Sequence, residues 1–322
     1  MDFSARSTLN QQRREGSIVV QLETTMLSNF EITVEELASS VLTDSLRSVR
    51  YRLKRAARER TEDDEIVHQL RVSGRRALSA INLFEVFLPT SEGRWFRKLL
   101  KAILQAAGRA RDLDVLLRIQ LPRCGKLQKK MAKQWQAERA VSQKPLVALD
   151  RKLSQHNLFR NHIRSLVRNL KTVAADVDTG RGTQVVCDDR ILSQFSDLCG
   201  SVVKALGIEA DVRSLHKLRI AVKRLRYAAD LLLPVLQRQR MRDMAKALAR
   251  LQKQLGAMQD HVVAKQELKR SIKGLRRRSH RKLLRDLIES ETRSIAEGVA
   301  KFHAWFDSDA CRDLKQCIEA LV

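Results

Sequence analysis

The chain has 322 residues, with 62 lysines and arginines against 37 aspartates and glutamates, which gives a formal charge of +25. It is 43% apolar and contains only 12 glycines and 4 prolines. The apolar share is large enough for a folded core, and the shortage of turn residues argues against a sandwich or barrel of many short strands. Because the commonest residues are good helix formers, we predict an all-α protein.

The first predicted helices follow a tail at residues 1–30, which carries no net charge and is expected to be flexible. Thr33-Val34-Glu35-Glu36 has the form of a capping box and would open a helix that runs to about Arg60. A second helix is predicted from the acidic residues 62–65 to about Leu88. A third covers 91–105, with a short continuation from about 111, and one or two more lie within 125–176. Gly108 and Gly256 are expected to mark a helix end or a close approach between helices.

The clearest linker is the polar stretch at 179–186, after which the helical pattern restarts. Helices are predicted over 187–206, 212–233, 238–256, 258–273, 278–300 and 308–321. We predict one helical domain at 31–322, which consists of a first repeat at 31–178, the linker at 179–186 and a second repeat at 187–322.

An internal repeat with a constant spacing of 148 residues is the strongest signal. Val67-His-Gln-Leu-Arg matches Leu215-His-Lys-Leu-Arg, and the match continues without a gap to Asp112 and Asp260. Several of the identical pairs are charged, which core packing would not require. The pattern therefore predicts a tandem duplication of one helical unit.

The repeated helix would carry a basic stripe opposite an apolar face. At 100° per residue, His68, Arg71 and Arg75 share one sector, whereas Leu70 and Ile81 lie on the other side. Rows of arginine and lysine suit an extended polyanion, because arginine can bridge two phosphate oxygens and lysine supplies a compact charge. The predicted binding residues on these and the following helices are His68, Arg71, Arg75, Arg76, Arg94, Lys98, His216, Arg219, Lys223, Arg224, Arg226, Arg242 and Lys246.

Two further basic rows have no clear counterpart at the 148-residue spacing, and we interpret them as solvated surface. One runs along the first predicted helix and the other precedes the linker. Their members are Arg47, Arg50, Lys54 and Arg58, and Arg160, Arg164, Arg168 and Lys171.

The repeated histidines show no metal-binding or catalytic spacing. Neither has a second histidine four residues away, so no metal or cofactor is predicted. No repeated carboxylate pair or nucleophile accompanies them, so we expect a protein that is not an enzyme, with a phosphohydrolase using His68 or His216 as an alternative. Asp112 and Asp260 are interpreted as helix N-caps or salt-bridge partners rather than ligands of Mg²⁺.

Nucleic acid is the rival polyanion. Only 4% of residues are aromatic, and none alternate with the basic rows as base stacking would require. Non-specific binding to phosphates at low salt stays an alternative, as does a scaffold role. The five cysteines form an odd set without Cys-x-x-Cys spacing, and no apolar run approaches the roughly 18 residues of a membrane span. We therefore expect a cytoplasmic protein without membrane contact.

These residues resemble the CHAD domain, the conserved-histidine α-helical domain. The resemblance is carried by the two histidine motifs, by Gly108-Arg-Ala-Arg-Asp-Leu-Asp-Val115 and by Leu251-Gln-Lys-Gln-Leu-Gly-Ala-Met-Gln-Asp260, and it covers roughly 31–322. It implies two pseudo-symmetric four-helix bundles around a basic central cavity. It also implies non-catalytic binding of inorganic polyphosphate, often at polyphosphate granules. One departure, Ser73-Gly74 in place of Ala221-Val222, is expected to reflect close packing between the copies.

Overall fold

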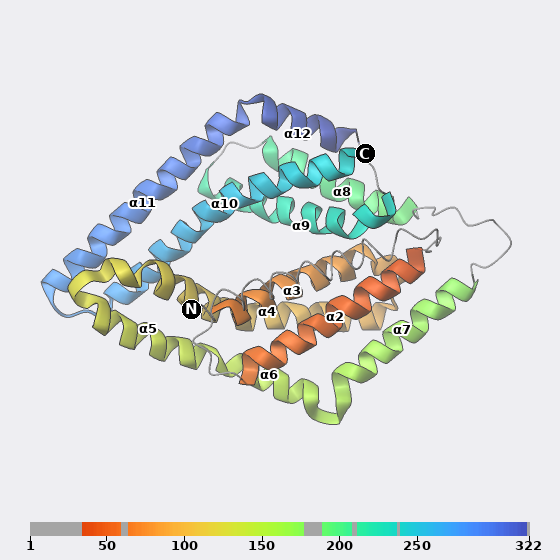
Figure 1. Ribbon diagram of the computed structural model, residues 1–322, viewed down its shortest axis with the longest axis horizontal. Coiled ribbons are helices and arrows are strands. Elements are labelled where there is room, and N and C mark those ends of the chain that lie inside the picture. Colours follow the sequence, from red (N-terminus) through yellow and green to blue (C-terminus); the bar gives the residue numbers. More distant parts are fainter. Residues whose placement is uncertain (1–33, 59–63, 177–188, 208–210, 237–238, 321–322) are drawn as a thin grey trace, which may run out of the picture.

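The computed structural model describes residues 34–58, 64–176, 189–207, 211–236 and 239–320, and all regular structure in these ranges is helical (Figure 1). The prediction of an all-α fold is confirmed. The tail at 1–30, Thr33 of the capping box and the linker at 179–186 lie outside the described residues. The first half contains α2 (Val34–Arg58), α3 (Asp64–Leu83), η1 (Glu85–Phe87), α4 (Thr90–Ile119), η2 (Leu121–Leu127), α5 (Gln128–Ser142), α6 (Lys144–Ser154), η3 (Gln155–Asn157) and α7 (Leu158–Asp176). The second contains α8 (Asp189–Leu206), α9 (Val212–Leu236), α10 (Gln239–Ile272), α11 (Arg278–Phe306) and α12 (Asp309–Glu319).

The helices pack as two groups that meet along α3 and α9. Helices α2, α3, α4 and α7 contact one another, and so do α8, α9, α10 and α12. Helices α5 and α6 lead from α4 to α7, and the long α11 leads from α10 to α12 along the outside of the molecule (Figure 1). The two groups share one apolar core, which fixes α3 against α9. The pseudo-symmetric relation between the two halves stays a prediction.

The apolar faces expected for the repeated helix are confirmed. On α3, Leu70, Ala77 and Ile81 are fully buried, and on α9, Val222 and Leu225 are fully buried. Because these residues recur at helical spacing, burying them turns the basic stripes of both helices away from the core. The core therefore sets the direction in which the candidate binding residues point.

Two predicted helix breaks and one predicted helix end were wrong. Helix α4 continues through Gly108 and helix α10 through Gly256, although breaks were expected there. A glycine inside a helix costs only about 1 kcal/mol relative to alanine, which packing of a long helix offsets. Helix α9 ends at Leu236 rather than before Pro234.

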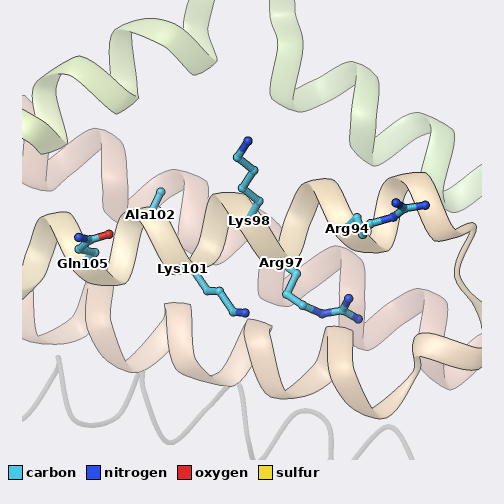
Figure 2. Close-up of a pocket in the computed structure, with 6 residues that line it drawn as sticks. All are labelled: Arg94, Arg97, Lys98, Lys101, Ala102 and Gln105. Carbon is cyan, nitrogen blue, oxygen red and sulfur yellow. The ribbon is translucent and has the colours of Figure 1, made fainter.

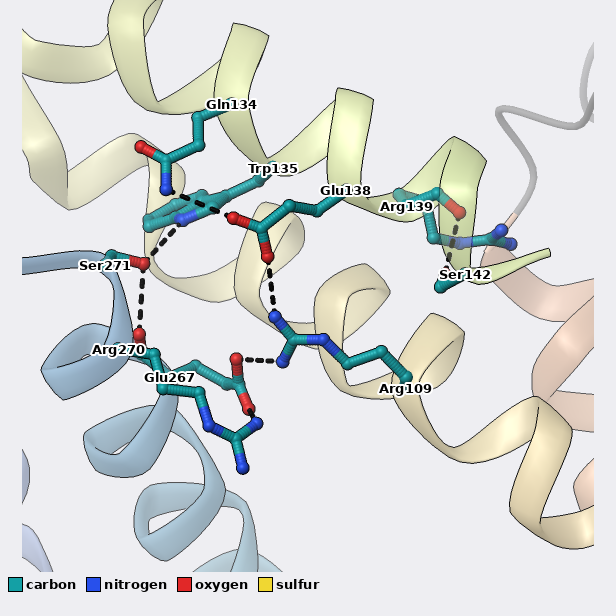
Figure 3. Close-up of polar contacts among 9 residues, drawn as sticks. All are labelled: Arg109, Gln134, Trp135, Glu138, Arg139, Ser142, Glu267, Arg270 and Ser271. Atoms are coloured by element: carbon teal, nitrogen blue, oxygen red, sulfur yellow. Dashed lines mark hydrogen bonds and ion pairs between the residues drawn. The ribbon is translucent and has the colours of Figure 1, made fainter. Parts of the chain in front are cut away.

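A second apolar core lies at one end of the molecule, where α4, η2 and α5 meet α10 and α11. Trp135 is fully buried in it, and its Nε1–H donates to Ser271 Oγ at 2.9 Å (Figure 3). Arg109 of α4 pairs with Glu138 of α5 at 2.6 Å and with the buried Glu267 of α10 (Figure 3). These contacts join helices that are far apart in the chain.

Glu291 of α11 is a second polar tie at this end. It is 1% exposed and accepts hydrogen bonds from Gln120 at 3.1 Å and from Arg123, and its carboxylate lies 2.7 Å from His261 Nδ1. Burial alone would raise its pKa, but the contacts with His261, Arg123 and Gln120 bring it below the usual value. The charge of Glu291 is thus retained in the interior, where it holds η2 against α10 and α11.

Replacing Trp135 with alanine should destabilise the fold by about 3–5 kcal/mol, because a large side chain leaves a cavity and Ser271 loses its donor. Urea denaturation followed by circular dichroism measures this free energy. Gln136→Ala, at an exposed position of the same helix, should change stability by less than about 0.5 kcal/mol. A Trp135→Ala variant as stable as Gln136→Ala would contradict the second core.

Candidate functional site

Four of the predicted cations come together where α3 meets α9. They are Arg71 and Arg75 of α3 with Arg219 and Lys223 of α9, and we call them the central cluster. Burial, with the charges of Arg75, Arg219 and Arg71, lowers the pKa of Lys223 to about 7. Burial and the charge of Arg75 likewise lower the pKa of Arg71 to about 10 and lower that of Arg219. Arg75 is thus close enough to disfavour the charged forms of Arg71, Arg219 and Lys223.

Arg71 is fixed by helix α4, which passes beside it. Its guanidinium donates to the Leu104 carbonyl at 2.9 Å. A Cβ on Gly108 would lie 3.4 Å from the same guanidinium, so Gly108 marks a close approach to a side chain of α3. Gly74 of α3 packs in a similar way, with Leu104 Cδ2 3.2 Å from the position of a Cβ. This contact lies within the first repeat, so the expected packing of Gly74 between the copies was wrong.

Two carboxylates face the central cluster without neutralising it. Asp112 and Asp260 lie inside α4 and α10, so the interpretation as N-caps was wrong. The charge of Asp112 partly opposes the lowering of the pKa of Arg71, and the charge of Asp260 partly opposes the lowering of the pKa values of Arg219 and Lys223. In the described part of the chain no carboxylate lies within 4 Å of the cations Arg75, Arg219 and Lys223. Arg219 Nε also has no hydrogen-bond partner there.

His68 lies at the edge of the cluster among further cations. Burial lowers its pKa, and Arg111, Arg118 and Arg75 lower it further, against an opposing effect of Glu65. The neutral form of His68 is therefore favoured, and a neutral imidazole can donate one N–H. We did not predict Arg111 and Arg118 as neighbours, because the expected break at Gly108 separated them from the preceding helix.

The other residues of the predicted α9 stripe have partners or face solvent. His216 is exposed, and its Nδ1 lies 2.8 Å from Gln259 Oε1. Arg226 donates to Gln252 at 2.8 Å, and its guanidinium lies 5.0 Å from the Tyr227 ring centre. Arg224, exposed, lines a small polar cleft between α3, α8 and α9.

Arg94 and Lys98 lie on α4 at some distance from the central cluster. With Arg97 and Lys101 they line a shallow hollow, in which Lys98 points to one side of the helix and Arg97 and Lys101 to the other (Figure 2). At 1.5 Å per residue, Lys98 is about 15 Å along α4 from Gly108, where Arg71 approaches.

The remaining predicted cations are also outside the cluster. Arg76 is exposed on α3, and Arg242 and Lys246 are exposed near the start of α10. Lys246 is about 21 Å along α10 from Asp260, and it lies 3.8 Å from Asp243. The structure therefore groups four predicted residues tightly and leaves these three apart.

The basic rows interpreted as solvated surface are mostly exposed. Arg47, Lys54 and Arg58 of α2 and Arg160 and Arg164 of α7 face solvent. Arg50 differs, because it pairs with Asp150 and donates to Ser154 Oγ at 2.8 Å. Lys171 lies among side chains that the structure does not describe.

The described residues contain neither a metal-binding group nor a membrane span. No three histidine, cysteine, aspartate or glutamate side chains among them gather as a metal site would require. No helix in the described ranges is both long and apolar enough to cross a membrane.

Known proteins resemble the chain over most of its length. The family model of the CHAD domain matches residues 40–269. The crystal structure of the CHAD domain from the plant Ricinus communis matches with a TM-score of 0.58 and 23% identity, over 90% of this chain and 93% of that one, which shows a common fold. PptA from Streptomyces chartreusis matches with a TM-score of 0.49 and 16% identity, over 87% of this chain and 99% of that one. No curated protein matches the chain.

Replacing Lys223 with methionine should stabilise the free protein, and more so at pH 7 than at pH 10. The pKa of Lys223 is about 7 in the folded chain and near 10.5 when unfolded, so the unfolded state gains a proton first as the pH falls. Wild-type stability therefore decreases between about pH 10.5 and pH 7, and the methionine variant lacks this loss.

Urea denaturation at several pH values measures the difference between the two proteins. Lys217→Met, at an exposed position of the same helix, is the matched control. A Lys223→Met variant that is less stable than Lys217→Met at pH 7, or a difference independent of pH, would contradict the crowding of charge around Lys223.

Proposed function

The chain belongs to the CHAD domain family, and we propose that it binds inorganic polyphosphate at the central cluster without hydrolysing it. Binding of this kind would also place the protein at polyphosphate granules. The observation that carries the proposal is the meeting of the α3 and α9 stripes at one point, where burial and the charge of Arg75 lower the pKa values of Arg71, Arg219 and Lys223.

The central cluster has the charge that a phosphate chain would compensate. Four cations face two carboxylates, so positive charge is left over in a half-buried position. Burial strengthens electrostatic interaction with an anion, because less water screens it. The guanidinium groups of Arg71, Arg75 and Arg219 could each bind two phosphate oxygens, while Lys223 adds a point charge.

Polyphosphate suits this location better than a nucleic-acid duplex. The cations lie where two packed helices meet and are partly covered, which favours a thin chain without bases over a bulky ligand. A duplex presents its phosphates on a wide, stiff cylinder that contacts protruding groups more readily. Hydrolysis is disfavoured because burial and the nearby arginines lower the pKa of His68, and these arginines provide neither a nucleophile nor a general base.

Isothermal titration calorimetry with long-chain polyphosphate at 150 mM salt tests the proposal. We expect the wild-type chain to bind, and a variant with all four cluster residues replaced to bind at least tenfold more weakly, because each lost cation removes a charge-assisted contact. The replacements are Arg71→Ala, Arg75→Ala, Arg219→Ala and Lys223→Ala.

A matched variant controls for the loss of charge. It removes four exposed cations of α2 and α7, which lie outside the cluster: Arg47→Ala, Lys54→Ala, Arg160→Ala and Arg164→Ala. Equal losses in the two variants, or no binding by the wild-type chain, would reject the proposal. Phosphate release, assayed with and without a divalent metal, should stay at the background rate, and release that requires His68 or His216 would favour the hydrolase alternative.

Polyphosphate affinity should fall as the pH rises from 7.5 to 9. The pKa of Lys223 is about 7 in the free protein, and a bound phosphate would raise it, so binding takes up a proton in this range. Lys223→Arg, which stays charged, should remove most of the pH dependence. Titrations in buffers of different ionisation enthalpy measure the proton uptake. The same uptake in wild type and Lys223→Arg would show that another group titrates.

A further inference from the structure

Two stretches of the chain are basic and contain no carboxylate. Residues 115–137 include six lysines and arginines, and residues 268–285 include nine, without an aspartate or glutamate in either range. Neither stretch supplies a residue of the central cluster or of the two stripes, although Arg118 of the first lies near His68. Together they hold a large part of the net charge of +25.

The structure brings these stretches together at one end of the molecule. Cys124, Leu127 and Met131 from the first pack with Leu275 and Leu284 from the second in the second apolar core. The turn between α10 and α11 therefore lies beside η2 and the start of α5, at one corner of the fold (Figure 1). We call residues 126–133 and 269–285 the distal tip. Lys273 lies about 20 Å along α10 from Asp260 at the central cluster.

The cations of the distal tip are exposed and nearly all lack carboxylate partners. Every lysine and arginine in it faces solvent. Among the described residues, Arg270 pairs with Glu267, and none of the others in the tip forms an ion pair with a carboxylate. The contacts of Arg123 and His261 with Glu291 lie next to the distal tip and hold η2 and α10 against α11 there.

The start of α11 places these charges unfavourably for the free protein. Its first turn contains no acidic residue, and its N-cap, Arg277, makes no side-chain capping bond. Arg278 and Arg281 thus lie at the positive end of the helix dipole, where carboxylates would be favoured. An anion bound at this point would reduce the repulsion among the arginines and accept hydrogen bonds from the uncapped N–H groups of the first turn.

We propose that the distal tip is a separate binding surface for duplex nucleic acid, which it contacts through the phosphate backbone without reading sequence. The cations recur at helical spacing on both helices: Lys129, Lys130 and Lys133 on α5, with Lys126 just before it in η2, and Arg278, Arg281, Lys282 and Arg285 on α11. The two rows therefore present charge along both helices that leave the corner. This proposal does not depend on polyphosphate binding at the central cluster.

A duplex fits the distal tip better than a thin phosphate chain or a membrane. The tip is an exposed corner, so a flexible chain would lose conformational freedom there without being enclosed, whereas a duplex is already stiff. No aromatic side chain of the tip is available for stacking on unpaired bases, because Trp135 beside it is buried. No large exposed apolar side chain lies within residues 126–133 or 269–285, so a membrane would gain no apolar insertion.

Fluorescence anisotropy with a labelled 20-base-pair duplex and the full chain tests the proposal. We compare wild type with a tip variant and with a control variant that loses the same charge on α2 and α7. The tip variant carries Lys129→Gln, Lys130→Gln, Arg278→Gln and Lys282→Gln, and the control carries Arg47→Gln, Lys54→Gln, Arg160→Gln and Arg164→Gln.

The tip variant should bind the duplex at least tenfold more weakly at 50 mM salt. Its slope of log affinity against log salt should become shallower by about 3 to 4, since each lost phosphate contact contributes about 0.9. The control should stay within about threefold of wild type, and a duplex of scrambled sequence should bind equally well. Equal losses in the tip and control variants, or a tip variant that binds like wild type, would overturn the proposal.

Other anions identify the partner and separate this result from the proposed function. The tip variant should retain wild-type affinity for polyphosphate, and equal loss of both ligands would overturn the assignment to a duplex. The assignment would also be overturned if wild type bound phosphatidylserine vesicles but not the duplex, and the tip variant no longer bound the vesicles. The tip variant should also melt no lower than wild type, because repulsion is relieved, whereas a lower melting temperature would indicate a structural role for these cations.

Discussion

Repulsion among half-buried cations between α3 and α9 is the constraint on which the rest of the structure depends. As an order of magnitude, two unit charges about 8 Å apart repel by about 2 kcal/mol at an effective dielectric constant of 20. The central cluster brings three arginines and a lysine together, and the pKa of that lysine is lowered to about 7. Proximity can persist only if other contacts hold the two helices together. The shared apolar core does this, because Leu70 and Ile81 of α3 and Val222 of α9 are buried in one continuous cluster.

Carboxylates are distributed in a way that leaves this repulsion uncompensated. The buried acids Asp114, Asp150, Glu267 and Glu291 pair with arginines away from the α3–α9 contact. Removing either partner of such a buried pair leaves a charge without compensation, so these ties fix the helices strongly in place. Near the central cluster, Asp112 and Asp260 act at longer range and form no close pair with Arg219 or Lys223. The buried ion pairs thus hold the helices in place, whereas the central cluster keeps positive charge that no close carboxylate compensates.

The sequence predicted the helices and the faces of α3 and α9, because apolar spacing determines which residues are buried. Residue spacing alone could not place the two stripes at one site, since that depends on the packing of the two groups of helices; only the resemblance to the CHAD family implied a shared basic cavity. Gly108 and Gly256 suggested breaks that long helices override, and Arg111 was missed for that reason. The distal tip is not evident from identical residues, because its two rows share charge rather than residue type. At the 148-residue spacing Lys129, Lys130 and Lys133 align with Arg277, Arg278 and Arg281, which conserves charge but not residue type.

The two basic regions differ in exposure, and this difference determines how salt acts on each. At 0.15 M salt the Debye length is about 8 Å, so fully exposed charges such as Lys129 and Arg278 are screened almost as in free solution. The cluster around Lys223 is partly shielded from solvent, and its interaction with an anion decreases less with salt. An anion at the central cluster also relieves repulsion that the fold has already imposed. Under the two proposals, we therefore expect affinity that persists at high salt to come from the central cluster, and binding at the distal tip to be weaker and more sensitive to salt.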